Sequence, residues 1–385
     1  MTLNVIRNTH WIIHARKLVK SHISKCVPCV RFGASSLSQQ MGNLPIPRVQ
    51  VSEAFSHVGV DLAGPLKIKM SFGRGYKSCK GYIVVFICFC TKAIHLEAVT
   101  GYDTDHFMAA FKRFISRRGL CRVVYSDCGT NFVGACKEIK SIFAEDSHRQ
   151  NKFTNYLAQQ GIEWRFNPPA APHFGGLWEA AVKSTKFHLK RVVGDHSLSY
   201  EELSTLLTMI EACLNSRPLS PISDDSTDLE ALTPAHFLIG RSLLSFPEDS
   251  LEHEKISLNQ RWKMITQMRD SFWRRWKNEY LQSLQLRSKW QMAKSNLQVD
   301  DLVLIMSELS PPSRWPLARV LKVHPGSDGL VRAATLRTAS SIFERPVAKL
   351  ILLPIIDHDV SANLPRRAGC LETRPAENSS IENAH

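Results

Sequence analysis

Short apolar runs and helical stripes alternate along the chain between about residues 50 and 245. Runs typical of buried strands occupy residues 58–60, 82–90, 95–99, 122–126 and 162–166. Apolar residues recur every three or four positions over residues 104–118, 178–193 and 200–215, a spacing that predicts helices. Because strands come first and helices are interleaved later, the pattern predicts an α/β domain built around a central sheet.

Two other patterns follow this domain. An apolar stripe within residues 255–297 predicts a long, basic amphipathic helix, which carries four of the chain's eight tryptophans. A solvated basic face over a core stripe is the ordinary interpretation of such a helix, and contact with DNA or with a partner helix is the alternative. Residues 300–354 contain four short strand patterns and a Pro/Gly/Asp turn at 325–329, which predicts a small β-barrel.

The two ends of the chain have a different character. Residues 1–45 are basic, contain a Cys-x2-Cys pair and pass into a linker rich in Ser, Gln, Gly and Pro. Residues 355–385 show no periodicity, so we expect a disordered tail there.

The charge balance indicates an acidic partner. Among 385 residues, 49 Lys and Arg against 35 Asp and Glu give a net charge of +14, which nucleic acid or an anionic membrane surface would neutralise. The longest apolar run, residues 82–90, is far shorter than the ~20 residues of a membrane-spanning helix, and residues 11–13 are too few for a signal peptide. We therefore expect an intracellular protein whose ten cysteines are mostly reduced thiols, and we favour nucleic acid as its partner.

Three carboxylates lie where a domain of this kind binds ligands. Asp61 and Asp127 each end a predicted strand, and Glu179 opens a predicted helix after a Pro/Gly loop. Carboxylates at strand ends face the crevice of an open α/β sheet, and Mg²⁺ prefers such oxygen ligands, with phosphate oxygens and water completing its shell. Taken singly, each residue is more typical of a turn, a cap or a first-turn acid. Their three contexts together indicate a metal site.

An ordered series of strings resembles one family. The strings are VDLAGPL, YSDCGTNFVGA, WRFNPPAAPHFGGLWEAAVKS, LNSRPLSP and LTPAHFLIG, followed by RWKMITQMRDSFWRRW, VDDLVLI, WPLARVLKVHPGSDGLVR and RPVAKLILLPI. From about residue 10 to 355, they resemble the integrase region of Pao/BEL-type LTR retrotransposons. The resemblance implies an RNase H-like integrase core over residues 50–245, with a mixed five-stranded sheet and flanking helices. It also implies a remnant zinc-binding segment in residues 1–45 and an SH3-like β-barrel over residues 300–354.

The resemblance further implies two-metal chemistry on DNA. Asp61, Asp127 and Glu179 match the family's D,D,E triad, which holds two Mg²⁺ or Mn²⁺ ions for in-line displacement at phosphorus. Water as the attacking group gives 3′-end processing, and the resulting DNA 3′-OH gives strand transfer. The implied partners are element-end DNA, target DNA and further copies of the chain, in the nucleus after a cytoplasmic stage.

Two lysines are candidate DNA contacts beside the triad. Lys183 and Lys186 lie four and seven positions after Glu179, so one helix face carries all three residues. The lysines would hold DNA phosphates. The alternative is an ordinary Glu–Lys surface pair.

Two other polar residues are candidate DNA contacts from the resemblance. His173 precedes Gly175 and Gly176 in the loop before the helix of Glu179, and the family uses this loop, which is mobile, to position DNA. Asn131 matches a polar position near the substrate, and a cap of the following helix is the alternative.

Cys26 and Cys29 have the spacing of half a zinc site. The family combines such cysteines with two histidines, but His10 and His14 lie closer to the cysteines than the family's gap. We therefore expect that the family's histidine pair lay before the first residue and that the zinc site is incomplete, with His10, His14 and His22 as substitute ligands. One equivalent of tightly held zinc would refute this expectation.

A second departure from the family is Cys128, where similar integrases carry Asn beside the second aspartate. The two departures are typical of a decaying element copy. Three functions therefore stay open: an active strand transferase, a truncated or domesticated DNA-binding scaffold, and an RNase H-like nuclease that acts alone.

Overall fold

The structure is a computed structural model of the 385-residue chain. It describes residues 2–7, 10–27, 45–69, 77–148, 161–167, 176–194, 196–223, 225–243, 254, 260–285, 296–307 and 310–354. Within these ranges, the side chains of residues 2, 4, 5, 142–148 and 176–182 are not described. The chain divides into two compact units, Met1–Ile46 and Pro47–His385, and each is described by itself.

The first unit contains two helices, α1 (Thr2–Arg7) and α2 (Ala15–Lys25). Ala15 is the one buried residue of α2. The apolar side chains around α2 are largely exposed, Trp11 by 88%.

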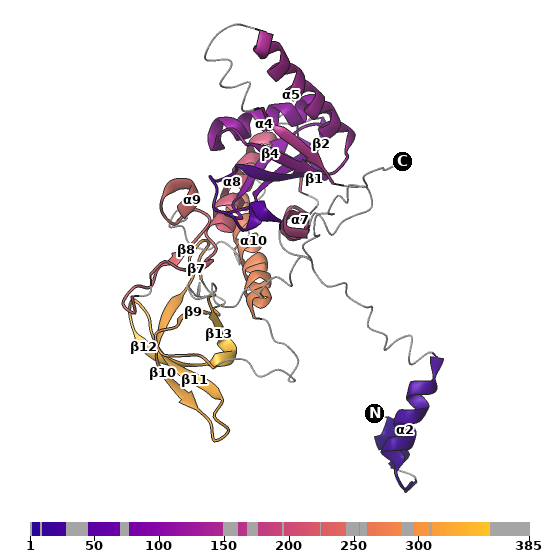
Figure 1. Ribbon diagram of the computed structural model, residues 1–385, viewed down its shortest axis with the longest axis vertical. Coiled ribbons are helices and arrows are strands. Elements are labelled where there is room, and N and C mark those ends of the chain that lie inside the picture. Colours follow the sequence, from indigo (N-terminus) through magenta and orange to yellow (C-terminus); the bar gives the residue numbers. More distant parts are fainter. Residues whose placement is uncertain are drawn as a thin grey trace, which may run out of the picture. The chain divides into compact units, whose positions relative to one another are not determined.

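A mixed sheet forms the centre of the second unit (Figure 1). Its strands are β1 (His57–Lys69), β2 (Ser78–Cys88), β3 (Ile94–Val99), β4 (Val123–Ser126) and β5 (Glu163–Phe166). In the spatial order β3-β2-β1-β4-β5, the first three strands pair antiparallel, whereas β4 pairs parallel with β1 and β5 parallel with β4. A two-residue strand, β6 (Leu198–Ser199), pairs with the C-terminal end of β1.

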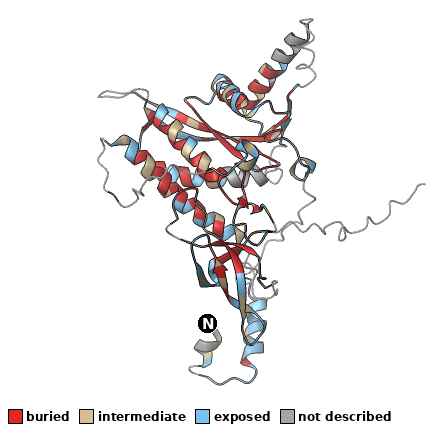
Figure 2. Ribbon diagram, turned by 90° about the vertical axis from the view of Figure 1, so that its left-hand side faces the viewer, coloured by how far each residue is buried: buried red, intermediate tan, exposed pale blue. Residues whose placement is uncertain are grey.

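Helices cover both faces of this sheet. One face is packed by α4 (Thr104–Arg118) and α5 (Thr130–His148), and the other by α7 (Gly176–Val193), α8 (Tyr200–Asn215) and α10 (Arg261–Leu284). Figure 2 shows the buried residues gathered along the sheet and on the inward sides of the helices. Because β2 lies between both layers, its residues 83–88 are all buried, which explains their uninterrupted apolar sequence.

Two of these helices begin at capped residues. The Asp103 side chain accepts a hydrogen bond from His106 N at 3.0 Å at the start of α4. Ser199 and Glu202 form a capping box at the start of α8. Both helices have the bounds that the apolar spacing predicts.

The long helix α10 belongs to the core of the second unit. Ile265, Phe272 and Trp273 are at most 2% exposed and pack with side chains of β2, β3 and α8. The predicted apolar stripe is therefore covered by the chain's own core, and it does not offer a surface to a partner helix. Trp262, near the start of α10, is 52% exposed.

The C-terminal segment forms a five-stranded antiparallel sheet. Its strands are β9 (Leu302–Ile305), β10 (Leu317–Pro325), β11 (Val331–Arg337), β12 (Ile342–Pro346) and β13 (Leu350–Leu352), in the order β12-β11-β10-β9-β13. The predicted turn joins β10 to β11, with Gly326 N donating to Leu330 O at 2.9 Å and Gly329 at a φ of 74°. The smaller elements are β7 (Ser220–Pro221), β8 (Ala231–Leu232), α9 (His236–Ile239) and the 3₁₀ turns Ile46–Arg48 and Val347–Lys349.

The predicted fold class is confirmed: an RNase H-like mixed five-stranded sheet with flanking helices, a long helix and a small antiparallel sheet. Two strand predictions were wrong. β1 does not end at Asp61 but continues to Lys69, because β2 stays paired with it beyond the end of β4. The last of the four strand patterns, residues 347–353, instead forms a 3₁₀ turn followed by the short strand β13. The preceding strand, β12, was missed because its residues are mostly exposed and show no apolar pattern.

Candidate active site

The register of two neighbouring strands aligns Asp61 with Asp127. β1 and β4 run parallel with Gly59 opposite Tyr125. Asp61 lies two residues beyond Gly59, and Asp127 lies two residues beyond Tyr125. Since side chains two positions apart share one face of a strand, both carboxylates belong to the same side of the sheet at adjacent positions. Tyr125 packs in the cluster that contains α7, so this is the side that α7 covers.

The local backbone fixes each carboxylate. Asp61 Oδ1 accepts a hydrogen bond from Leu62 N at 2.7 Å, and Asp127 Oδ1 accepts one from Gly129 N at 3.1 Å. A Cβ at Gly129 would lie 2.7 Å from Asn131 Oδ1 and 3.2 Å from Asp127 Oδ1, so a side chain there would displace the Asn131 amide. The turn after β4 therefore holds Asp127 close to the start of α5.

The charges of both carboxylates change the pKa of Tyr102. Burial, and then the negative charges of Asp127 and Asp61, raise the pKa of Tyr102 above its usual value. Tyr102 is 48% exposed and its ring contacts Tyr82, with ring centroids 5.2 Å apart. The sequence analysis missed Tyr102, which follows β3 by three residues and belongs to none of the motifs used there.

Helix α7 is joined directly to Asp61. Lys186 Nζ donates to Asp61 Oδ2 at 2.7 Å, and the two side chains are 33% and 27% exposed. Glu179 lies in α7 seven positions before Lys186, hence on the same helix face, but its side chain is outside the described residues. Lys183, which is exposed, lies between them near that face. The structure thus brings together Asp61, Asp127 and the helix that carries Glu179.

Asn131 is buried beside Asp127 without a hydrogen-bond partner. Its side chain is 2% exposed, and neither atom of its amide has a partner within the part of the chain that the structure describes. It lies inside α5, which begins at Thr130, and its side chain does not cap that helix. The alternative role of Asn131 as a helix cap is therefore wrong. Its side-chain amide is buried next to Asp127 without a hydrogen-bond partner among the described residues.

These residues fit a hard divalent cation. Two carboxylates and an amide oxygen are ligands that Mg²⁺ and Mn²⁺ prefer, and a buried amide with no partner is costly unless another group satisfies it. Among the described side chains, no three His, Cys, Asp or Glu residues gather closely enough to hold a metal. The described part therefore supplies two of the three predicted carboxylates.

The remaining predicted site residues lie elsewhere or outside the described ranges. Cys26 follows α2 and is partly buried, whereas Cys29 is outside the described residues, so zinc binding stays a prediction. His173 and Gly175 are also outside them. Cys128 is exposed, and its thiol donates to Asn167 O at 3.3 Å. Every cysteine that the structure describes is free.

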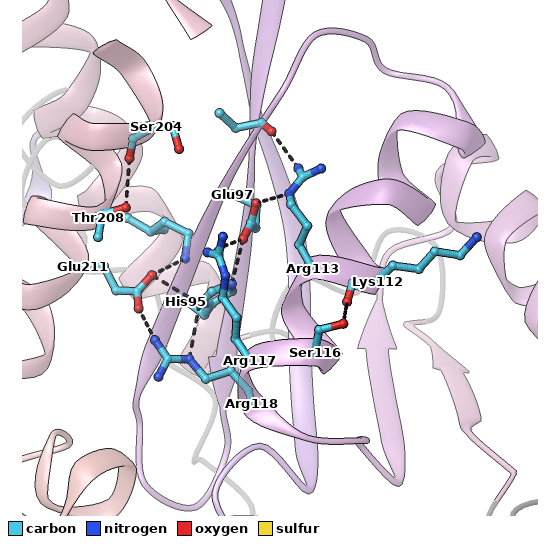
Figure 3. Close-up of polar contacts among 12 residues, drawn as sticks. His95, Glu97, Lys112, Arg113, Ser116, Arg117, Arg118, Ser204, Thr208 and Glu211 are labelled. Atoms are coloured by element: carbon cyan, nitrogen blue, oxygen red, sulfur yellow. Dashed lines mark hydrogen bonds and ion pairs between the residues drawn. The ribbon is translucent and has the colours of Figure 1, made fainter. Parts of the chain in front are cut away.

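A buried charge network lies on β3, away from the triad motifs (Figure 3). His95, which is 1% exposed, contacts Glu97 at 3.1 Å and Glu211 of α8 at 3.3 Å. Arginines of α4 complete the network: Arg113 donates to Glu97 at 2.6 Å, and Arg118 pairs with Glu211. A His and a Glu two positions apart in an otherwise apolar strand are a sequence signal that could have identified it.

Both buried groups of this network have shifted pKa values. Burial by itself lowers the pKa of His95, but hydrogen bonds to Glu211 and Glu97 outweigh it and raise the net pKa. Burial likewise acts to raise the pKa of Glu97, and hydrogen bonds from His95 and Arg113 outweigh it and lower the net pKa. The network therefore favours the charged forms of both His95 and Glu97.

Comparison with known protein families matches the C-terminal part of the chain. Residues 260–353, which contain α10 and the C-terminal sheet, match a family of unknown function, DUF5641. No curated protein matches the chain. In the described ranges, no helix is both long and apolar enough to cross a membrane.

Among solved structures, the chain is similar to a chain of the simian T-cell lymphotropic virus intasome, determined by cryo-electron microscopy in complex with PP2A regulatory subunit B56 gamma. The two chains are 11% identical, the alignment covers 92% of this chain and 100% of that one, and the TM-score is 0.35. At that TM-score, the fold assignment depends on the strand order and pairing described above. That strand order, with three antiparallel strands followed by two parallel ones, is the RNase H-like topology.

Proposed function

We propose that this protein is the integrase of a Pao/BEL-type LTR retrotransposon and catalyses metal-dependent 3′-end processing and strand transfer of DNA. One observation carries the proposal: Asp61 on β1 and Asp127 directly after β4 each lie two residues beyond the paired residues Gly59 and Tyr125, and α7, the helix of Glu179, is bonded to Asp61 through Lys186. The motif strings and the net charge of +14 support the same function.

Each residue has its own role in the proposed reaction. Mg²⁺ or Mn²⁺ held by Asp61, Asp127 and Glu179 would supply stabilisation of charge during in-line displacement at phosphorus. Lys186 neutralises Asp61 in the absence of a cation, and once released it would bind a DNA phosphate, as would the exposed Lys183. The Asn131 amide offers a hydrogen-bonding group beside Asp127.

As part of the same proposal, the protein works in the nucleus on element-end and target DNA, as a multimer. A catalytically inactive DNA-binding scaffold is the second candidate. The ion pair between Lys186 and Asp61 favours it, because the ammonium group already satisfies the carboxylate that a cation would need.

A strand-transfer assay with the element's own terminal repeat tests the proposal. Wild-type protein with Mn²⁺ is expected to yield joined DNA, and Asp61→Asn, Asp127→Asn and Glu179→Gln are expected to abolish the joined product, a loss of at least about a thousandfold. Cleaved DNA without joined strands would favour a nuclease. Salt-sensitive DNA binding without metal-dependent products would favour the scaffold.

A further inference from the structure

The two opposite faces of α7 make different polar contacts. At about 100° per residue, positions 179 and 186 lie at nearly the same angle around the axis of α7, and positions 184 and 188 lie about 140° and 180° away from position 179. Lys186 reaches Asp61 of the sheet. Ser184 and His188 instead face α10, where both contact one side chain.

That side chain is Glu279 of α10. Its Oε1 accepts a hydrogen bond from Ser184 Oγ at 2.9 Å, and its Oε2 lies 2.6 Å from His188 Nε2. His188 is 5% exposed and also packs edge-on against Phe272 of α10, with ring centroids 6.0 Å apart. One carboxylate thus holds two positions of α7 that are one helical turn apart, which fixes both the rotation and the axial position of that helix.

The contact is suited to positioning rather than to overall stability. Glu279 is 49% exposed, and ion pairs at such sites contribute little to the free energy of unfolding. Among the described side chains of α7, the buried apolar anchors Leu189 and Val193 lie in its C-terminal half. Ser184 lies nearer to Glu179, so the contact with Glu279 restrains the part of α7 closest to the candidate metal site.

We propose that Glu279 is a positioning residue for the candidate active site: by holding Ser184 and His188, it keeps the opposite face of α7, which carries Lys186 and position 179, on the side of Asp61. This inference rests on the proposed function. It also gives the DUF5641 segment a role in catalysis, since Glu279 belongs to that segment and contacts neither the carboxylates nor Lys186 in the described structure. A displacement of about 1 Å in a catalytic group can cost about a hundredfold in rate.

Hydrogen exchange of the full-length protein tests the restraint without relying on activity. In Glu279→Ala, amides of residues 183–193 are expected to exchange about tenfold faster than in wild type, because a charge-assisted contact is lost. Amides of α4 should be unchanged. Asn278→Ala, at the exposed neighbouring position on the same helix, is the matched control and should leave α7 unchanged.

Steady-state kinetics test the positioning. Glu279→Ala is expected to lower kcat for strand transfer about tenfold with an unchanged KM for DNA and an unchanged Tm, and Glu279→Gln, which keeps one acceptor oxygen, should fall between it and wild type. Ser184→Ala should show a smaller effect of the same kind.

Equal exchange of α7 in Glu279→Ala and wild type would overturn the inference, whether or not the protein joins DNA. Faster exchange with an unchanged kcat would overturn it as well. A wild-type protein that neither nicks nor joins DNA would contradict the proposed function, and the exchange result would still decide the restraint.

Discussion

At the scale of single residues, the arrangement of Asp61 and Asp127 follows from strand pairing. The parallel register of β1 and β4 makes the two aspartates neighbours, although 65 residues separate them in the sequence (127 − 61 − 1). Two carboxylates this close repel each other unless a cation lies near them. The ammonium group of Lys186, bonded to Asp61, places a positive charge there.

This arrangement predicts the effect of Lys186 on metal binding. Lys186→Gln should tighten Mn²⁺ binding about three- to tenfold, because an ion must displace the ammonium group of Lys186 from Asp61 in wild type and the pair is partly solvent-screened. Isothermal titration with Mn²⁺ measures the change. Lys183→Gln, on the same helix but without a bond to Asp61, is the control. Equal affinities in wild type and Lys186→Gln would show that the ion pair does not compete with the metal.

The network around His95 predicts a pH dependence of stability. A raised pKa of His95 stabilises the folded state below its ordinary value of 6.5, and this contribution is lost as pH rises through the folded pKa. A lowered pKa of Glu97 stabilises the fold above its ordinary value of 4.5, and this contribution is lost as pH falls through the folded pKa. The network therefore contributes most between pH 4.5 and 6.5.

Chemical denaturation of wild type and His95→Gln at several pH values tests this window. The difference in the free energy of unfolding between the two proteins should shrink as pH rises above 6.5. A difference that stays constant from about pH 5.5 to 8.5 would mean that the pKa of His95 is the same in the folded and unfolded states, and a difference that grows with pH would mean that burial lowers that pKa; either result would contradict the prediction.

At the scale of elements, α10 joins the core to the C-terminal sheet. Its buried face packs with α8, β2 and β3, Lys277 donates to Ser307 O at 2.8 Å, and Tyr280 Oη donates to Pro218 O at 2.7 Å. Residues 47–243 alone would expose the apolar surface that α10 covers. The sequence pattern separates a core, residues 50–245, from a helical segment, residues 255–297. In the structure, α10 of that segment packs in the same hydrophobic core as β2, β3 and α8.

Two tryptophans of α10 provide a matched test of this packing. Trp273 is 2% exposed and its indole donates to Ser310 O at 3.0 Å, whereas Trp262 is 52% exposed. Trp273→Ala should lower the free energy of unfolding by about 3 to 5 kcal/mol, and Trp262→Ala by less than about 1 kcal/mol. Urea denaturation followed by circular dichroism measures both. If Trp273→Ala and Trp262→Ala lowered the free energy of unfolding equally, the packing of Trp273 in the core would be contradicted.

Most elements of the core were predictable, because each is either buried on two faces or strongly amphipathic. The apolar spacing predicts α4 and α8 to the residue, and β2 is evident from its continuous apolar run. The length of β1 was not predictable, since its continuation past Asp61 depends on pairing with β2. Likewise, contacts of Glu279 depend on how α10 docks, and the isolated helix sequence contains no sign of that docking.

At the scale of the whole molecule, the chain carries a net charge of +14, whereas the candidate site is acidic, with Asp61 and Asp127. In the proposed function, the excess positive charge would attract DNA at long range, while Asp61 and Asp127 would concentrate negative charge where a cation binds. The proposed function requires that these two carboxylates share a metal ion, which would contact a DNA phosphate. Both the proposed catalysis and the proposed positioning role of Glu279 require this shared metal ion.

Anomalous diffraction from crystals of the protein grown with Mn²⁺ tests this claim most directly. We expect an anomalous peak between the carboxylates of Asp61 and Asp127, a Lys186 ammonium group that has left Asp61, and no such peak in Asp127→Asn. Crystals that show no manganese at these carboxylates, with the Lys186–Asp61 ion pair intact at saturating Mn²⁺, would contradict it.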